Sequence, residues 1–153
     1  MALLLLLAIP LAGSLALAVF GARRWAAELN AAFSIATFAA ACALTARVIA
    51  EGPMLVAHEQ FFVDPFNVFL IALTAFVGMT TSLFSRPYMR VEEAHGRVNR
   101  RRLRLYHSMY QLFCFTMLAA LSTNNLGILW VAMEAATLST VLLVSLYRTA
   151  ASI

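Results

Sequence analysis

Five long apolar runs dominate this sequence of 153 residues, and their lengths restrict what the chain can fold into. The runs cover residues 2–20, 31–50, 65–84, 106–122 and 126–147. A bilayer core about 30 Å thick needs roughly 20 apolar residues in a helix, so these runs have the length of transmembrane helices. They are unbroken and lack the polar–apolar alternation of a membrane β-barrel. The sequence therefore predicts an all-α integral membrane protein with about five transmembrane helices.

The composition excludes a water-soluble domain. The chain is 63% hydrophobic and 12% charged, whereas soluble domains average about 45–50% apolar and about 25% charged residues. Cys42 and Cys114 lie in separate apolar runs, and no His, Cys or carboxylate cluster has the spacing of metal ligands. We therefore expect no metal site and no disulfide, and we expect both cysteines to fill space between helices.

The arginines are distributed unevenly between the connections. Arg23 and Arg24 follow the first run, and seven more lie around the connection after the third run: Arg86, Arg90, Arg97, Arg100, Arg101, Arg102 and Arg104. The connection after the second run has no arginine and carries Glu51, Glu59 and Asp64. Short loops rich in Lys and Arg stay cytoplasmic. This predicts a multi-pass protein of the inner (plasma) membrane, with its N-terminus outside and the chain end on the cytoplasmic side.

Local residues predict where several helices begin and end. No basic residue precedes the first run, so we expect a retained helix there and not a cleaved signal peptide. Asp64 and Pro65 have the chemistry of a helix N-cap and first turn. Pro87 is expected to follow the third helix, since proline cannot continue the hydrogen-bond ladder. One of residues 123–125 should cap the fifth helix.

Glu134 is the strongest candidate for chemistry, because it lies deep inside the apolar run 126–147. An ionisable residue at such depth is costly and is by default a functional hypothesis. A carboxylic acid can take up and release a proton, as a proton path requires. We expect Glu134 to face other helices or water, with small neighbours such as Ala135 allowing close approach. The structural alternative is a protonated Glu134 that hydrogen-bonds a neighbouring helix.

Weaker candidates accompany it. His107 lies at the inner end of the fourth run and Thr137 lies one helical turn beyond Glu134, so either could assist a proton relay. The basic stretch that holds Arg97, Arg100, Arg101, Arg102 and Arg104 is expected to set topology and to contact lipid phosphate groups or a soluble partner subunit. No module for nucleic acid, catalytic nucleophile–base pair or nucleotide-binding loop is visible. Autonomous catalysis and a bound cofactor are not expected.

Two stretches resemble a known family. "FTMLAALSTNNLGILWVAMEAATLSTVLLVSLYRT", residues 115–149, and "FFVDPFNVFLIALTAFVGMTTSLFSRPYMR", residues 61–90, are similar to antiporter-like proton-translocating membrane subunits. These subunits are shared by respiratory complex I, Mrp-type sodium/proton antiporters and group 4 hydrogenases. The pattern "NNLGILWVAMEAATLST" is most similar to component F of hydrogenase-4 and formate hydrogenlyase-type complexes.

The resemblance implies a role for Glu134 and a larger context. The acidic residue of the fifth helix belongs to a buried charge path in this family, and Glu134 occupies that position. Its usual partner is a lysine on a later broken helix, but this sequence contains no lysine. Family members are longer, with a transport unit built from two inverted repeats. The chain thus resembles an N-terminal part of such a subunit, which alone would not conduct protons.

Three functions remain open at this point. The first is a membrane subunit, or part of one, that couples electron transfer to proton translocation alongside other membrane subunits of a respiratory or hydrogenase complex. The second is an Mrp-type antiporter subunit that exchanges protons for cations such as sodium. The third is a structural membrane scaffold for soluble redox subunits. The expected organisation is two generic helices with an outer loop (1–60), a third helix with the arginine-rich loop (61–105), and the start of the antiporter-like repeat (106–153).

Overall fold

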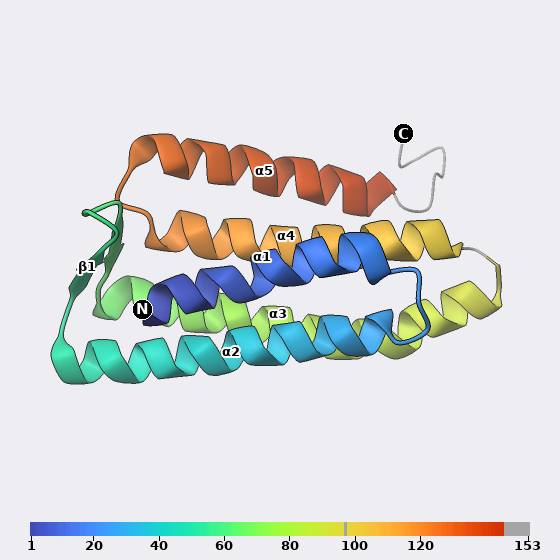
Figure 1. Ribbon diagram of the computed structural model, residues 1–153, viewed down its shortest axis with the longest axis horizontal. Helices are drawn as coiled ribbons and strands as arrows, with labels where there is room; N and C mark the ends of the chain where they lie inside the picture. The colour runs from blue at the N-terminus through green and yellow to red at the C-terminus, as the bar shows by residue number, and fades with distance from the viewer. Residues whose placement is uncertain (97, 146–153) are drawn as a thin grey trace.

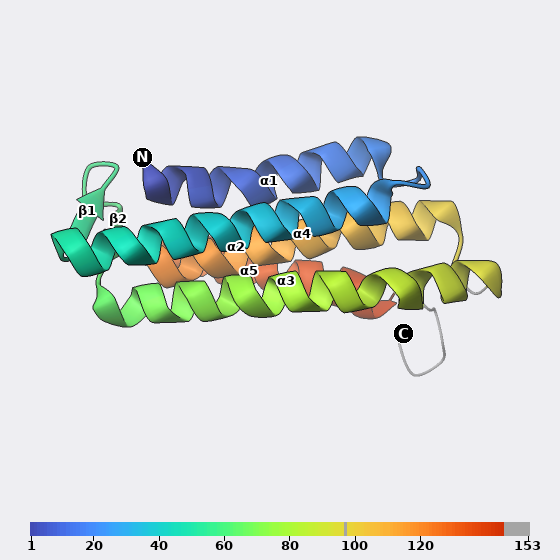
Figure 2. The ribbon, with the colours of Figure 1, turned by 90° about the horizontal axis from the view of Figure 1, so that it is seen from below.

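The computed structural model describes residues 1–96 and 98–145, and most of them are helical. Five helices form an elongated bundle (Figures 1 and 2): α1 Ala2–Phe20, α2 Ala26–Glu51, α3 Pro65–Ala94, α4 Arg100–Ser122 and α5 Leu126–Val144. Four of them, α1, α2, α3 and α5, are long and apolar enough to cross a membrane. These helices confirm the prediction of an all-α membrane protein with about five helices, whereas the orientation in the membrane stays a prediction.

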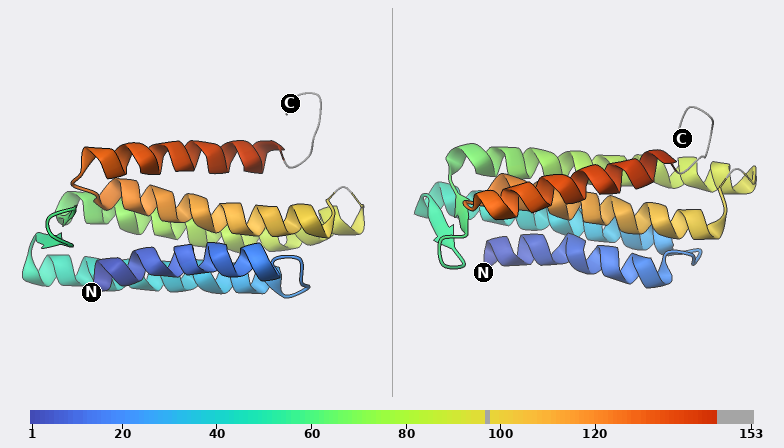
Figure 3. Two further views of the ribbon diagram at one scale, coloured as in Figure 1. Left: turned by 45° about the horizontal axis from the view of Figure 1, so that its top comes forward. Right: turned by 90° about the horizontal axis from the view of Figure 1, so that it is seen from above.

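Helix α4 lies in the middle of the bundle and packs against α1, α2, α3 and α5 (Figure 3). Its buried side chains are mostly polar: His107, Ser108, Tyr110, Gln111, Thr116 and Ser122. Because its neighbours are helices and not lipid, α4 can carry polar groups that bond across the bundle. This explains why α4 is the one described long helix that is not apolar enough to count as a membrane span by composition.

The apolar core lies where the first half of α1 meets α2, α3 and α4. Leu6, Leu44, Ile71 and Leu118 are fully buried there and come from four different helices. Helix α5 adds only small groups to the interior, its buried residues being Ala132, Ala136 and Ser139. Small side chains let membrane helices approach closely, so α5 packs on α4 along a narrow strip.

A short β-hairpin, which the sequence reading did not predict, closes one end of the bundle. Its strands are β1 (Met54–Val56) and β2 (Phe61–Val63), paired antiparallel with Met54 opposite Val63. The hairpin is tied to the turn between α4 and α5, because the Asn125 amide donates to Gln60 Oε1 over 2.7 Å. The connection between α2 and α3 is therefore a folded cap on this end of the molecule (Figure 1).

Asp64 begins α3 as predicted, and Pro65 occupies the first turn. The Asp64 carboxylate accepts from the Asn67 backbone N–H over 2.7 Å, while the Asn67 side chain accepts from the Asp64 N–H over 2.8 Å. The prediction for the fifth helix is also confirmed, since Asn125 caps α5 by accepting from Gly127 N–H. Both helices thus start at side chains that satisfy backbone donors left free in the first turn.

We expect Asp64→Ala to lower the free energy of unfolding by about 1 kcal/mol, because two backbone donors of α3 lose their acceptor. Asp64→Asn is the matched control, since asparagine is an equally good N-cap. Unfolding of the protein in mixed micelles measures both variants. A loss as large for Asp64→Asn as for Asp64→Ala would contradict a capping role.

Three predicted helix boundaries are wrong. Helix α2 begins at Ala26 and not at residue 31. Pro87 lies inside α3, which continues to Ala94, ten residues past the predicted end at residue 84. Proline removes one hydrogen bond from the ladder, but burial of Met89 and of Glu92 beyond it holds the last turns of α3 against the bundle. Helix α4 starts at Arg100 and not at residue 106, because Asn99 accepts from the Arg102 N–H and caps it.

Candidate functional site

Glu134 lies close to the middle of α5, as its ninth residue. The side chain is exposed and stands on the opposite side of the helix from the buried Ala132, Ala136 and Ser139. Its neighbours on that side are exposed as well, with Trp130 at 67% of its possible surface. Helix α5 is at the edge of the bundle (Figures 1 and 3). Within the described residues, Glu134 therefore faces away from the other four helices. These helices do not enclose it, so it does not face another described helix.

Thr137 shares this outward side of α5. It is exposed, and its hydroxyl donates to the Met133 carbonyl over 3.0 Å, one turn back along the helix. The hydroxyl oxygen keeps lone pairs for a further donor, since a hydroxyl has one donor and two acceptor sites. The structure thus places Thr137 beside Glu134 on one surface, as the spacing predicted.

His107 is in a different place. It is 4% exposed, lies in α4 and lines a pocket at the end of the bundle where α1 meets α2 and where α3 meets α4. No residue of α5 lines this pocket. The structure does not bring His107 and Glu134 together, so a direct relay between them has no support in the described bundle.

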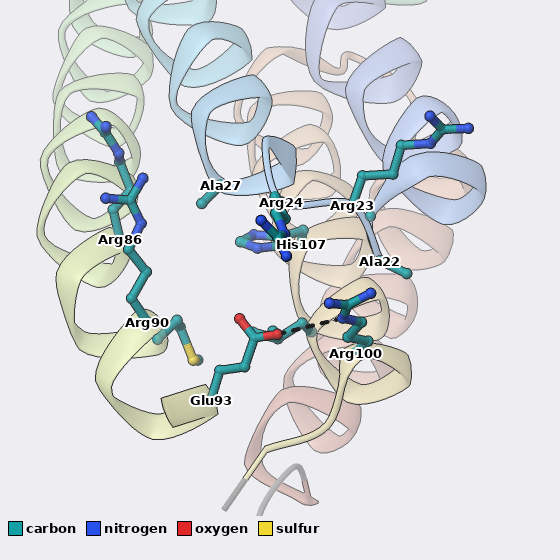
Figure 4. A pocket seen from close by; sticks show the side chains of 12 residues that line it. Ala22, Arg23, Arg24, Ala27, Arg86, Arg90, Glu93, Arg100 and His107 are labelled. Atoms are coloured by element: carbon teal, nitrogen blue, oxygen red, sulfur yellow. Dashed lines mark ion pairs between the residues drawn. The ribbon is translucent and has the colours of Figure 1, made fainter. Parts of the chain in front are cut away.

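The predicted basic contact residues divide into two groups around α4. Arg100 lines the His107 pocket and its Nε lies 3.8 Å from Glu93 Oε1 (Figure 4). Arg101, Arg102 and Arg104 line a wider cleft of about 610 Å³ together with Leu142 and Ser145. Arg97 falls outside the described residues. Arg23 and Arg24 of the α1–α2 connection and Arg86 and Arg90 of α3 gather at the same end of the molecule.

A buried polar network between α2, α3 and α4 was missed by the sequence reading. The Gln111 amide donates to Asn30 Oδ1 over 2.8 Å and to Ser34 Oγ over 3.0 Å. The Asn30 amide in turn donates to Ser82 Oγ over 3.1 Å. The available signal was the spacing of polar residues, because Asn30 and Ser34 are one helical turn apart at the start of the apolar run 31–50. This network fixes how three helices face each other.

The two cysteines differ in environment. Cys114 is partly buried and lies beside Gly78, where an added Cβ would come within 3.4 Å of its sulfur. Cys42 is exposed on α2, so the expectation that it fills space between helices is wrong for the described bundle. Alanines flank Cys42 on α2, so the sequence does not show which side of this helix packs into the bundle.

No family model matches the chain. A curated relative does: the "Hydrogenase-4 component F homolog" of Methylacidiphilum infernorum (isolate V4) is 41% identical over 144 residues. This match covers 94% of the present chain and 29% of the relative, so the chain spans less than a third of the relative's length. The match agrees with the four helices that are long and apolar enough to cross a membrane. Over these residues, the chain is similar in sequence to a hydrogenase-4 component F-like membrane subunit.

Proposed function

We propose that the chain is part of a membrane subunit of a hydrogenase-4, formate hydrogenlyase-type or complex I-like oxidoreductase in the inner (plasma) membrane. The subunit couples electron transfer in its partner subunits to proton translocation, with Glu134 as the relay acid. The similarity to a hydrogenase-4 component F homolog supports the type of complex. The position of Glu134 supports the proton relay.

One observation carries the proposal: Glu134 is at mid-length of an apolar membrane helix and on its outward side. Eight residues of helix separate it from the start of α5, about 12 Å along the axis. At that depth an ionised carboxylate facing lipid costs a few kcal/mol or more. Polar protein or water outside the described residues is therefore required to cover it, and this covered surface is where a proton could pass.

The immediate surroundings of Glu134 suit a transfer surface more than a packing contact. Among the described residues, no side chain donates to or pairs with its carboxylate, whereas Thr137 offers a hydroxyl one turn away. A packing role would need a hydrogen-bond partner in the adjoining helix, but α4 lies on the other side of α5. A basic residue of a later helix or another subunit is the expected partner, and a lysine would fit.

The arginine-rich end has a separate task in this proposal. Arg101, Arg102 and Arg104 flank an open cleft that reaches the last turn of α5. Side chains of this kind bind lipid phosphate groups or acidic surfaces of a soluble subunit. The excess of arginine at this end supports a cytoplasmic location for it, because positively charged loops are retained inside.

The proposal is tested by electron-driven proton movement in the complete complex. Inverted membrane vesicles with the assembled complex receive reduced viologen as electron donor, and a pH-sensitive dye follows the interior. We expect interior acidification that tracks hydrogen evolution, does not require sodium and disappears with an uncoupler. Hydrogen evolution without acidification would contradict the proposal in favour of a scaffold. Sodium-dependent proton exchange without electron donor would contradict it in favour of an Mrp-type antiporter.

A further inference from the structure

The pocket at the arginine-rich end is built by three parts of the chain that are distant in sequence (Figure 4). Arg24 comes from the α1–α2 connection, Arg86 and Arg90 come from α3, and Arg100 and His107 come from α4. The apolar Met89 and Leu103 are buried beside them. The pocket is thus a product of the tertiary fold and is not a property of the basic loop alone.

Two buried nitrogen atoms of this pocket have no hydrogen-bond partner among the described residues. They are His107 Nδ1 and Arg86 Nε. His107 is 4% exposed and lines the pocket. An unpaired buried polar atom costs about 1–3 kcal/mol, and native proteins satisfy nearly all such atoms. Arg86 Nε is always a donor, and His107 Nδ1 is a donor in the tautomer that carries its proton there, so an acceptor satisfies both nitrogens.

The charges around the pocket specify what kind of acceptor fits. Five arginines and a single carboxylate, that of Glu93, line it. Glu28 lies beside them and pairs with the terminal nitrogens of Arg86 and Arg90, while Glu93 is near Arg100. Arg24 is exposed and has no carboxylate partner within the described part of the chain. The lining is therefore net positive after its ion pairs are counted, which favours an anion.

The size of the cavity and its level in the membrane further restrict which anion fits the pocket. The cavity volume is about 40 Å³, and a water-sized group needs roughly 10–15 Å³ on this measure, so three to four such groups fit. The pocket adjoins the end of α1, whose 19 residues have the length of the bilayer core. Phe20 and Trp25 beside it are 42% and 45% exposed, as expected for aromatic residues at the level of lipid headgroups.

We propose that this pocket is a phosphate-binding site that takes the headgroup phosphate of an anionic lipid or a free phosphate ion. His107 Nδ1–H and Arg86 Nε–H donate to the phosphate oxygens from the buried side, and Arg24 binds from the open side. Arginine forms charge-assisted bonds with phosphate that are stronger than neutral ones. The bound phosphate would join the α1–α2 connection to α3 and α4.

The site is tested on the full-length protein in its complex, purified in neutral detergent. Binding of a fluorescent short-chain phosphatidylglycerol is measured by thermophoresis, with and without inorganic phosphate as competitor. Arg24→Gln is expected to weaken binding about 10-fold, since one charged contact is lost. Arg47→Gln is the matched control, because Arg47 is an exposed arginine of α2 that lines neither this pocket nor the other cleft. It should leave binding within about twofold, because it removes the same charge outside the pocket.

A second pair of variants tests the buried donor. His107→Leu removes it and is expected to abolish tight binding, while His107→Asn keeps an N–H at a similar place and should restore most of it. Displacement by inorganic phosphate would identify a site open to free phosphate, and its failure would identify a lipid site; both results support the pocket. Equal weakening by Arg24→Gln and Arg47→Gln, or equal binding by His107→Leu and the parent protein, would overturn it.

Discussion

Glu134→Gln is expected to reduce proton translocation by the assembled complex to background while the subunit still inserts and assembles. Glutamine has nearly the same size and can hydrogen-bond, but it cannot release a proton. The substitution should remove no packing contact within the described bundle, because Glu134 is exposed on the outward side of α5. The measurement is electron-driven acidification of inverted vesicles, with subunit content checked by immunoblot.

The matched control for this variant is Glu51→Gln. Glu51 is exposed at the end of α2 and pairs with Arg47 at 3.2 Å, so the same chemical change occurs outside the membrane interior. An exposed pair of this kind contributes little, and translocation should be unchanged. Full translocation by Glu134→Gln would exclude a proton relay through this residue. Loss of translocation in both variants would show that the effect does not depend on the depth of Glu134 in the membrane.

Gln111→Leu is expected to lower the free energy of unfolding by about 2 kcal/mol, because it removes the centre of a polar network between α2, α3 and α4. Three acceptors lie within reach of the Gln111 amide nitrogen: Asn30 O at 3.1 Å, Asn30 Oδ1 at 2.8 Å and Ser34 Oγ at 3.0 Å. Leucine has a similar volume but leaves Asn30 Oδ1 buried without this donor. Unfolding in mixed micelles measures the loss.

Thr37→Val provides the control for Gln111→Leu. Thr37 is equally buried in α2, but its hydroxyl donates to the Phe33 carbonyl of the same helix over 2.8 Å. Removal of this local bond leaves the interhelical network intact and should cost less than about 1 kcal/mol. If Thr37→Val destabilised the protein as much as Gln111→Leu, the interhelical bonds of Gln111 would not be the source of its effect.

The existence of the helices and several of their ends could be predicted from local chemistry. An apolar run of about 20 residues has few alternatives in a bilayer. Asp64 and Asn125 cap α3 and α5 by accepting from backbone N–H groups within three residues. The path of α3 through Pro87 could not be predicted, because it depends on contacts of its last turns with the rest of the bundle. The β-hairpin has strands of three residues, too short for a reliable pattern.

The depth of Glu134 in the membrane could be predicted from the sequence, but the direction in which its side chain faces could not. Position within an apolar run places Glu134 near the bilayer centre, and the sequence alone is enough for that. Small residues such as Ala132 and Ala136 decide which side of α5 meets α4, but the small residues Gly127 and Thr137 lie on its exposed side. Likewise, the phosphate pocket combines Arg24, Arg86 and His107 from three segments, and only the tertiary fold brings them together.

The most direct test of the proton relay is infrared difference spectroscopy of the complete complex during electron-driven turnover. If Glu134 takes up and releases a proton, a carboxylic acid carbonyl band will appear and disappear with turnover, and Glu134→Gln will lack it. A Glu134 carboxyl that keeps one protonation state throughout turnover, with no band lost in the variant, would contradict the account.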